Sequence, residues 1–214
     1  MTKLIIFDCD GVLVDSEPIA NKILIEVLGE IGLSITFEES LNLFLGKSWD
    51  DCLRIIKEKL PHDIDIDLTN TYMTRMFAEF EKSLSPVPGI RDVLENITYD
   101  VCVASSGPHE KIRKTLGITG LLQKFEGRIF SAADVKKGKP APDIFLLAAH
   151  TLKVRPEKCL VIEDSLNGIK AAIAANMKAI HYIPTNSFYK NTIQHKNITQ
   201  ISEMATLKKI LNCK

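Results

Sequence analysis

The chain has 214 residues, of which 45% are apolar and 25% charged, and its 27 basic side chains balance 27 acidic ones. This composition is typical of a globular protein with one large domain, or with a core and a small second domain. The charge balance argues against a nucleic-acid surface and a polybasic membrane contact, and no apolar run approaches the roughly 18 residues of a membrane span.

The amino-terminal residues and the cysteines indicate the cellular compartment of the protein. The chain becomes acidic too early, at Asp8, for a secretory signal peptide. The five cysteines show no CxxC spacing, and those in or beside apolar runs are typical of buried free thiols. We therefore expect a reducing, cytoplasmic location, and for a chain of this size we expect a monomer.

Apolar runs of strand length alternate with helical patterns over much of the chain. The strand-like runs are residues 4–7, 101–104, 128–131, 160–162 and 179–183. The helical patterns between them are residues 89–96, 110–116, 143–152 and 165–175. This alternation predicts an α/β, Rossmann-like core with a mainly parallel sheet and helices on both faces. Such a sheet binds ligands outside the carboxyl ends of its strands.

One stretch interrupts the alternation. From residue 16 to residue 87 the patterns are helical only, beginning with an apolar stripe that runs from Ile19 to Ile31. The segment Pro86-Val87-Pro88-Gly89 then returns the chain to the alternating region. We therefore expect a helical cap domain over residues 16–87, inserted into a core made of residues 1–15 and 88–214.

Two aspartates follow the first apolar run, in Leu4-Ile5-Ile6-Phe7-Asp8-Cys9-Asp10-Gly11. Side chains two positions apart on a strand leave the same face, so both carboxylates are expected to enter one small volume. Two negative charges that close need a metal ion, a proton or a nearby cation. The pair therefore suits chemistry better than stability.

Other predicted strands also end in polar groups. Ser105, with the turn amides that follow it, can bind phosphate oxygens before a helix amino end. Lys139 lies in a rigid Lys-Pro-Ala-Pro segment, and Glu163 and Asp164 follow the fourth run. We expect a divalent cation, most simply Mg2+, to bind Asp8, the main-chain carbonyl of Asp10, and Glu163 or Asp164.

This set of groups suits phosphoryl transfer. Asp8 can attack phosphorus and form an aspartyl-phosphate. Asp10 can protonate the leaving oxygen and later take a proton from water. Lys139 and Ser105 can hold the phosphoryl oxygens while the cation neutralises the carboxylates.

The same motifs resemble those of the haloacid dehalogenase-like superfamily. The first motif runs from Asp8 to Ser16, and Ser105, Lys139 and Glu163-Asp164 match the second, third and fourth. The segments 139–145 and 163–168 are similar to the branch that holds β-phosphoglucomutase and small sugar-phosphate phosphatases. The resemblance implies a Rossmann-like core, Mg2+ dependence, Asp8 as nucleophile and Asp10 as acid and base.

The sequence departs from the mutase at two places. Ala20 stands where β-phosphoglucomutase has a histidine, and the segment 46–49 reads Gly-Lys-Ser-Trp where the mutase has Gly-Val-Ser-Arg. The segment 15–18 is similar to phosphatases of the 6-phosphogluconate type. By the resemblance, the candidate substrate-binding residues are Gly46, Lys47, Ser106 and His109, and an exposed structural role is the alternative for His109. Trp49 follows the Gly46-Lys47 loop and is added as a substrate-binding candidate, with packing inside the cap as its alternative.

We therefore expect a Mg2+-dependent phosphatase of a small phosphorylated metabolite, either a sugar phosphate or a sugar-acid phosphate. A phosphomutase is the nearest alternative, and a catalytically silent module that binds a phosphorylated ligand is a third. A halogen–carbon hydrolase needs neither the second aspartate nor the metal, so Asp10 and Glu163-Asp164 argue against it.

Overall fold

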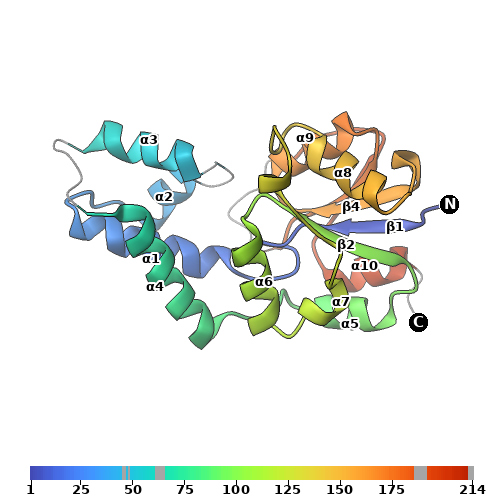
Figure 1. Ribbon diagram of the computed structural model, residues 1–214, viewed down its shortest axis with the longest axis horizontal. Coiled ribbons are helices and arrows are strands. Elements are labelled where there is room, and N and C mark those ends of the chain that lie inside the picture. The colour runs from blue at the N-terminus through green and yellow to red at the C-terminus, as the bar shows by residue number, and fades with distance from the viewer. Residues whose placement is uncertain (45–46, 48, 61–65, 186–191, 212–214) are drawn as a thin grey trace. The chain divides into compact units, whose positions relative to one another are not determined.

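The computed structural model describes residues 1–44, 47, 49–60, 66–185 and 192–211 (Figure 1). The chain divides into two compact units. The first combines Met1–Asp15 with Ser85–Lys214, and the second is Ser16–Leu84. Among the described residues, no helix has both the length and the apolar character that a membrane crossing requires.

The first unit is built on a six-stranded parallel sheet with the strand order β3-β2-β1-β4-β5-β6. The strands are β1 (Leu4–Phe7), β2 (Asp100–Ser105), β3 (Ile129–Ser131), β4 (Cys159–Glu163), β5 (Lys178–Tyr182) and β6 (Ile198–Ile201). All residues of β1 are fully buried, which is why this central strand reads as an unbroken apolar run. The predicted α/β class and parallel sheet are confirmed, and β6 is an addition at the sheet edge.

Helices cover both faces of this sheet (Figure 1). They are α5 (Ile90–Asn96), α6 (His109–Ile118), α7 (Leu122–Phe125), α8 (Asp143–Thr151), α9 (Leu166–Ala174) and α10 (Met204–Ile210), with short 3-10 turns at Ala132–Asp134 and Pro156–Lys158. On one face, α8 and α9 bury Phe145 and Ile169 against Ile6 and Val161 of the sheet. On the opposite face lie α5, α7 and α10 (Figure 1).

The second unit is helical, as its sequence predicts. Its helices are α1 (Glu17–Glu30), α2 (Phe37–Phe44), α3 (Trp49–Lys59) and α4 (Leu68–Ser83). Four members of the apolar stripe of α1 are buried, at the helical spacing Ile23, Leu24, Val27 and Leu28. Helix α1 contacts both α2 and α4, so the stripe forms the interior of this unit.

The return of the chain to the first unit lies earlier than residue 88. The Asp15 amide donates to the Ser85 carbonyl at 3.0 Å, and the Val87 amide donates to the Leu13 carbonyl at 3.0 Å. Val14 also forms an antiparallel bridge with Pro86. Residues 85–87 therefore belong with the loop after β1, and the helical unit ends at Leu84.

Candidate active site

The carboxyl end of β1 places Asp8 between its two neighbouring strands. The Asp8 amide donates to the Ile162 carbonyl at 2.9 Å, which continues the ladder with β4 by one residue. On the other side β1 pairs with β2, whose last residue is Ser105. Because these strands are parallel and adjacent, Asp8, Ser105 and Glu163 all lie at the carboxyl end of the sheet.

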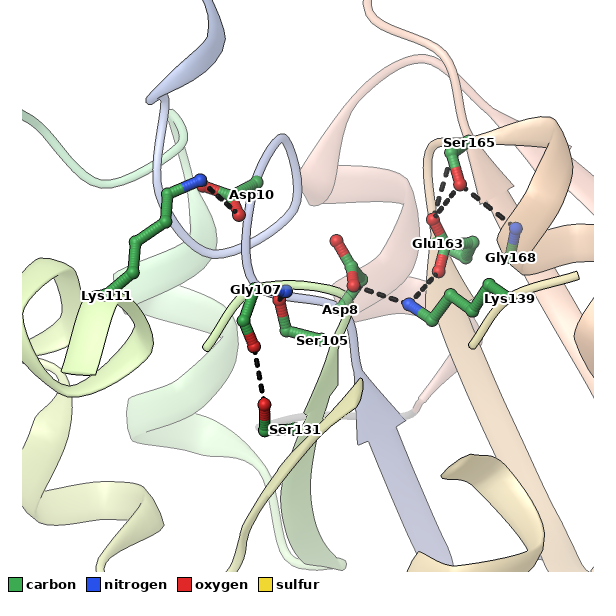
Figure 2. A network of polar contacts seen from close by, with 10 residues as sticks. All are labelled: Asp8, Asp10, Ser105, Gly107, Lys111, Ser131, Lys139, Glu163, Ser165 and Gly168. Carbon is green, nitrogen blue, oxygen red and sulfur yellow. Dashed lines mark hydrogen bonds and ion pairs between the residues drawn. The ribbon is translucent and has the colours of Figure 1, made fainter. Parts of the chain in front are cut away.

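A buried lysine joins two of these carboxylates (Figure 2). The Lys139 Nζ donates to Asp8 Oδ1 at 2.6 Å and to Glu163 Oε2 at 2.7 Å. The side chain of Lys139 is 2% exposed, and its ammonium also lies 5.0 Å from the centroid of the Phe145 ring. A short turn before α8, in which the Ala141 amide donates to the Gly138 carbonyl, positions Lys139 at the carboxyl ends of the strands.

Burial controls the ionisation of this cluster. Burial, and then the negative charge of Glu163, raise the pKa of Asp8 from 3.8 to about 7 against the opposing effect of Lys139. Burial lowers the pKa of Lys139, but the two carboxylates outweigh it and hold that pKa above its usual value. The single ammonium is therefore charged, yet it does not fully compensate the carboxylates around it.

Glu163 is fixed on both oxygens. Its Oε1 accepts from the Ser165 amide at 3.0 Å and from the Ser165 hydroxyl at 2.7 Å, while its Oε2 faces Lys139. The Ser165 hydroxyl in turn accepts from the Gly168 amide and caps α9. A Cβ at Gly168 would overlap the carboxyl group of Glu163, so the first turn of α9 leaves room only for glycine.

The third carboxylate of the cluster comes from Asp164. Asp8, Glu163 and Asp164 each offer an oxygen, and these oxygens lie within 4.8 Å of one another. The backbone of Gly11, at φ +75°, approaches Asp164 so closely that a Cβ there would overlap its carboxylate. Carboxylate oxygens are the ligands of hard divalent cations. Burial first, and the charge of Glu163 second, raise the pKa of Asp8, so a cation beside these carboxylates would stabilise their ionised forms. The residues therefore fit a divalent metal.

The end of β2 forms a loop suited to phosphate oxygens (Figure 2). Ser105 is 1% exposed, and its hydroxyl accepts from the Gly107 amide at 3.1 Å. The Ser131 hydroxyl, from the neighbouring β3, donates to the Gly107 carbonyl at 2.7 Å. Helix α6 begins two residues later, so its amino end and the loop lie together.

Asp10 is held separately from Asp8. Its Oδ2 accepts from the Lys111 Nζ at 2.9 Å, and both side chains are about four-fifths buried, at 19% and 23% exposed (Figure 2). Within the described residues, the side chain of Asp10 is not part of the metal-competent carboxylate group. A metal contact through its main-chain carbonyl stays a prediction.

The predicted substrate-binding residues have different surroundings. Ser106 is exposed, and the His109 Nε2 lies 2.8 Å from Asp134 Oδ1. In the helical unit, Trp49 stacks on Tyr72 with ring centroids 4.8 Å apart, and its Nε1 donates to Thr69 at 2.9 Å. Lys47 is exposed, and Gly46 lies outside the described residues. Substrate contact by these residues stays a prediction.

Two residues near the site were not singled out from sequence. Lys111 lies in the first turn of α6, and its contact with Asp10, 101 positions away, left no local signal in the sequence. The His181 Nε2 lies 2.9 Å from the Asp164 carbonyl, so it carries the hydrogen and donates. Burial lowers the pKa of His181, and its Nδ1 has no hydrogen-bond partner in the described part of the chain. This neutral imidazole therefore supports the loop that carries Asp164.

Comparison with known proteins agrees with this geometry. The model of the haloacid dehalogenase-like hydrolase family matches residues 2–176. A 6-phosphogluconate phosphatase of Escherichia coli K12 is 28% identical over 96% of this chain and 92% of its own length. A phosphorylated carbohydrates phosphatase of Thermotoga maritima is 33% identical over 84% of each chain.

A solved structure shares the whole fold. A haloacid dehalogenase-like protein of unknown function from Agrobacterium tumefaciens C58 superposes with a TM-score of 0.82, at 30% identity, over 99% of this chain and 98% of its own. The fold and site thus define a hydrolase of phosphoric monoesters. The chain belongs to the haloacid dehalogenase-like hydrolases, a family that typically uses a divalent metal, which confirms the resemblance inferred from its motifs.

Proposed function

We propose that this protein is a Mg2+-dependent phosphatase of small phosphorylated sugars or sugar acids, and that it acts through an aspartyl-phosphate on Asp8. The observation that carries the proposal is the convergence of Asp8, Glu163 and Asp164 around one small volume beside Lys139. A buried nucleophile, a fixed ammonium and a metal-competent carboxylate set are the parts that phosphoryl transfer needs.

The reaction divides into two displacements at phosphorus. In the first, Asp8 attacks the phosphorus atom, the ester P–O bond breaks, and Asp10 gives its proton to the leaving oxygen. In the second, water attacks the same phosphorus, Asp10 takes a proton from that water, and the bond between Asp8 and phosphorus breaks to release phosphate. General acid–base help of this kind accelerates a step by about 10²–10⁴-fold.

Other groups of the site stabilise the transferred phosphoryl group. Lys139 contacts Asp8 directly, so its ammonium lies where the charge of the phosphoryl oxygens develops. The loop from Ser105 to Gly107 supplies a hydroxyl and amides before the amino end of α6. Mg2+ held by Asp8, Asp164 and Glu163 would neutralise carboxylate charge and allow an anionic ester to approach.

The substrate class rests on the relatives. Two curated phosphatases of phosphorylated sugars or sugar acids align over most of this chain. Position 20, on α1, is also an alanine, whereas β-phosphoglucomutase has a histidine there. Hydrolysis is therefore favoured over the interconversion of sugar phosphates.

The test is a phosphate-release assay on a panel of esters. The panel contains 6-phosphogluconate, fructose 1-phosphate, glucose 6-phosphate, glucose 1-phosphate and 4-nitrophenyl phosphate, each with MgCl2 or with EDTA. We expect turnover only with the metal. Asp8→Asn, which keeps the size of the side chain, should abolish turnover while its circular dichroism and thermal midpoint stay near wild type. Full activity of Asp8→Asn refutes the assignment of the nucleophile.

The same panel separates the alternatives. A phosphomutase would convert glucose 1-phosphate to glucose 6-phosphate when a bisphosphate primer is present, whereas a phosphatase releases inorganic phosphate without isomerisation. A silent binding module would bind these esters, measured by calorimetry, without releasing phosphate from any of them. Either result would replace the phosphatase assignment.

A further inference from the structure

Each of the two aspartates after β1 has its own lysine (Figure 2). Lys139 contacts Asp8, whereas Lys111 on α6 donates to Asp10 Oδ2 at 2.9 Å. The two lysines come from different elements, and Figure 2 shows them on opposite sides of the aspartate pair. The ion pair between Lys111 and Asp10 is thus separate from the contacts of Lys139 with Asp8 and Glu163.

The local structure directs Lys111 to this partner. Helix α6 starts at His109, just after the loop of Ser105 and Gly107, and Lys111 is the third residue of its first turn. A Cβ on Gly107 would be 3.5 Å from Lys111 Cδ, so the stem of the lysine runs along the loop at van der Waals distance. With only 19% of its side chain exposed, this lysine is less free to rotate than a surface lysine, and the pair is less screened by salt.

We propose that Lys111 is a positioning residue, which orients the carboxylate of Asp10 toward the reacting groups in both displacements. The inference rests on the proposed function, because it assumes that Asp10 is the acid and base. Asp8 and Asp10 are two residues apart and repel each other, so the carboxylate of Asp10 needs an opposing cation to hold one direction. The fixed ammonium of Lys111 supplies that cation without occupying the metal-competent carboxylates.

The first test compares two kinds of leaving group. Lys111→Met should lower kcat/KM for the best sugar phosphate of the panel roughly 10- to 100-fold, because a misplaced acid no longer protonates an alkoxide. With 4-nitrophenyl phosphate, whose leaving group needs little protonation, kcat/KM should change little. Lys111→Arg should restore most of the loss. Equal losses for both esters, or no loss at all, would overturn the inference.

The second test asks whether Lys111 acts only through Asp10. In an Asp10→Asn background, adding Lys111→Met should cost no further activity, since coupled residues are non-additive. A further loss, or a rise in KM that dominates the effect, would instead assign Lys111 to substrate binding and contradict the positioning role. Arg113→Met is the matched control: this arginine lies on the same helix but pairs with exposed Glu126, so its loss should leave kcat unchanged.

The outcomes also separate this inference from the proposed function. If the wild-type protein releases no phosphate from any ester, the phosphatase assignment fails and the role of Lys111 fails with it. If the wild type is active and Lys111→Met equals it on sugar phosphates, only the positioning role is wrong. Thermal midpoints of each variant show whether a loss of activity follows a loss of folded protein.

Discussion

The contact between α9 and the carboxylate cluster can be tested by adding one methyl group. Gly168→Ala would place a Cβ on top of the carboxyl carbon and Oε2 of Glu163. A flexible surface side chain would turn away from such an overlap at little cost. Glu163 cannot, because it is 1% exposed and its two oxygens accept from Lys139 and Ser165.

The expected loss of stability depends on whether Glu163 or the backbone of α9 moves to relieve the overlap. If Glu163 turns aside, its charge-assisted bond with Lys139 is lost, which costs about 1.5–3 kcal/mol. If the backbone of α9 shifts instead, a methyl group forced into a packed site costs about 1–3 kcal/mol. The structure adopts the cheaper response or a mixture of the two, so we expect a loss of about 1–3 kcal/mol in the free energy of unfolding. The protein should remain folded, since domains typically have about 5–15 kcal/mol.

The assay is urea denaturation followed by circular dichroism, together with Mg2+-dependent phosphatase activity. Activity should fall at least about tenfold, because Lys139 loses one of its two anchors and 1.4 kcal/mol is already a factor of ten. Gly117→Ala is the control: this glycine is also helical, nothing lies within 4 Å of its Cβ position, and its substitution should be neutral or stabilising by about 0.5–1 kcal/mol. A wild-type urea midpoint for Gly168→Ala would show that Glu163 is not confined as described.

Two further predictions concern the metal and the substrate. Because burial and Glu163 raise the pKa of Asp8 to about 7, the folded metal-free protein binds a proton there that the unfolded chain, with its pKa of 3.8, releases. Asp8 therefore stabilises the folded state at low pH, and this stability is lost as the pH rises from about 4 toward 7. In EDTA, the difference in Tm between the wild type and Asp8→Asn should fall over this pH range. MgCl2 should then raise Tm more at pH 8 than at pH 5, and equal shifts would contradict this. Lys47→Ala should change the ratio of kcat/KM between esters of the panel by about tenfold, which corresponds to the loss of one charge-assisted hydrogen bond. The rate of hydrolysis of the aspartyl-phosphate should stay unchanged. Lys22→Ala, whose lysine pairs with Glu26 on the surface, is its control, and unaltered selectivity for Lys47→Ala would exclude a substrate contact.

The strands that could be predicted are those that the fold buries on both faces. β1 reads as four apolar residues because every position is covered, and the runs for β2, β4 and β5 are nearly as complete. β6 was missed because it lies at the sheet edge, where only Ile201 of its four residues is buried. Its sequence, Ile-Thr-Gln-Ile, therefore carries little apolar signal.

The site could be predicted where chain topology alone brings residues together. Asp8, Ser105 and Glu163 follow strands, and adjacent parallel strands end at one edge of the sheet, so their approach requires no knowledge of side-chain packing. The contact between Lys111 and Asp10 joins residues 101 positions apart through the side of a helix. Its existence depends on how α6 packs beside the loop after β1, which no local periodicity encodes.

The sequence also left open whether Glu163 or Asp164 binds the metal, and their surroundings differ. Glu163 ends β4 and points into the interior, where Lys139 and Ser165 use both of its oxygens. Asp164, the next residue, is only partly buried and lies against the backbone of Gly11. Asp164 follows the last residue of the strand, and its carboxylate still lies within 4.8 Å of those of Asp8 and Glu163. Glu163 therefore orients the lysine, while Asp164 has the freer carboxylate for the proposed cation.

If all four carboxylates of the site are ionised, charge counting favours a divalent ion for the proposed cation. Four carboxylates lie at the carboxyl ends of β1 and β4, on Asp8, Asp10, Glu163 and Asp164. Lys111 is paired with Asp10, and Lys139 is paired with Asp8 and Glu163. Two ammonium groups leave two negative charges, and a phosphate ester brings more. A monovalent ion would leave the site anionic before the ester arrives, whereas a divalent ion removes the remaining charge. The loop amides and the amino end of α6 can then stabilise the phosphoryl group itself.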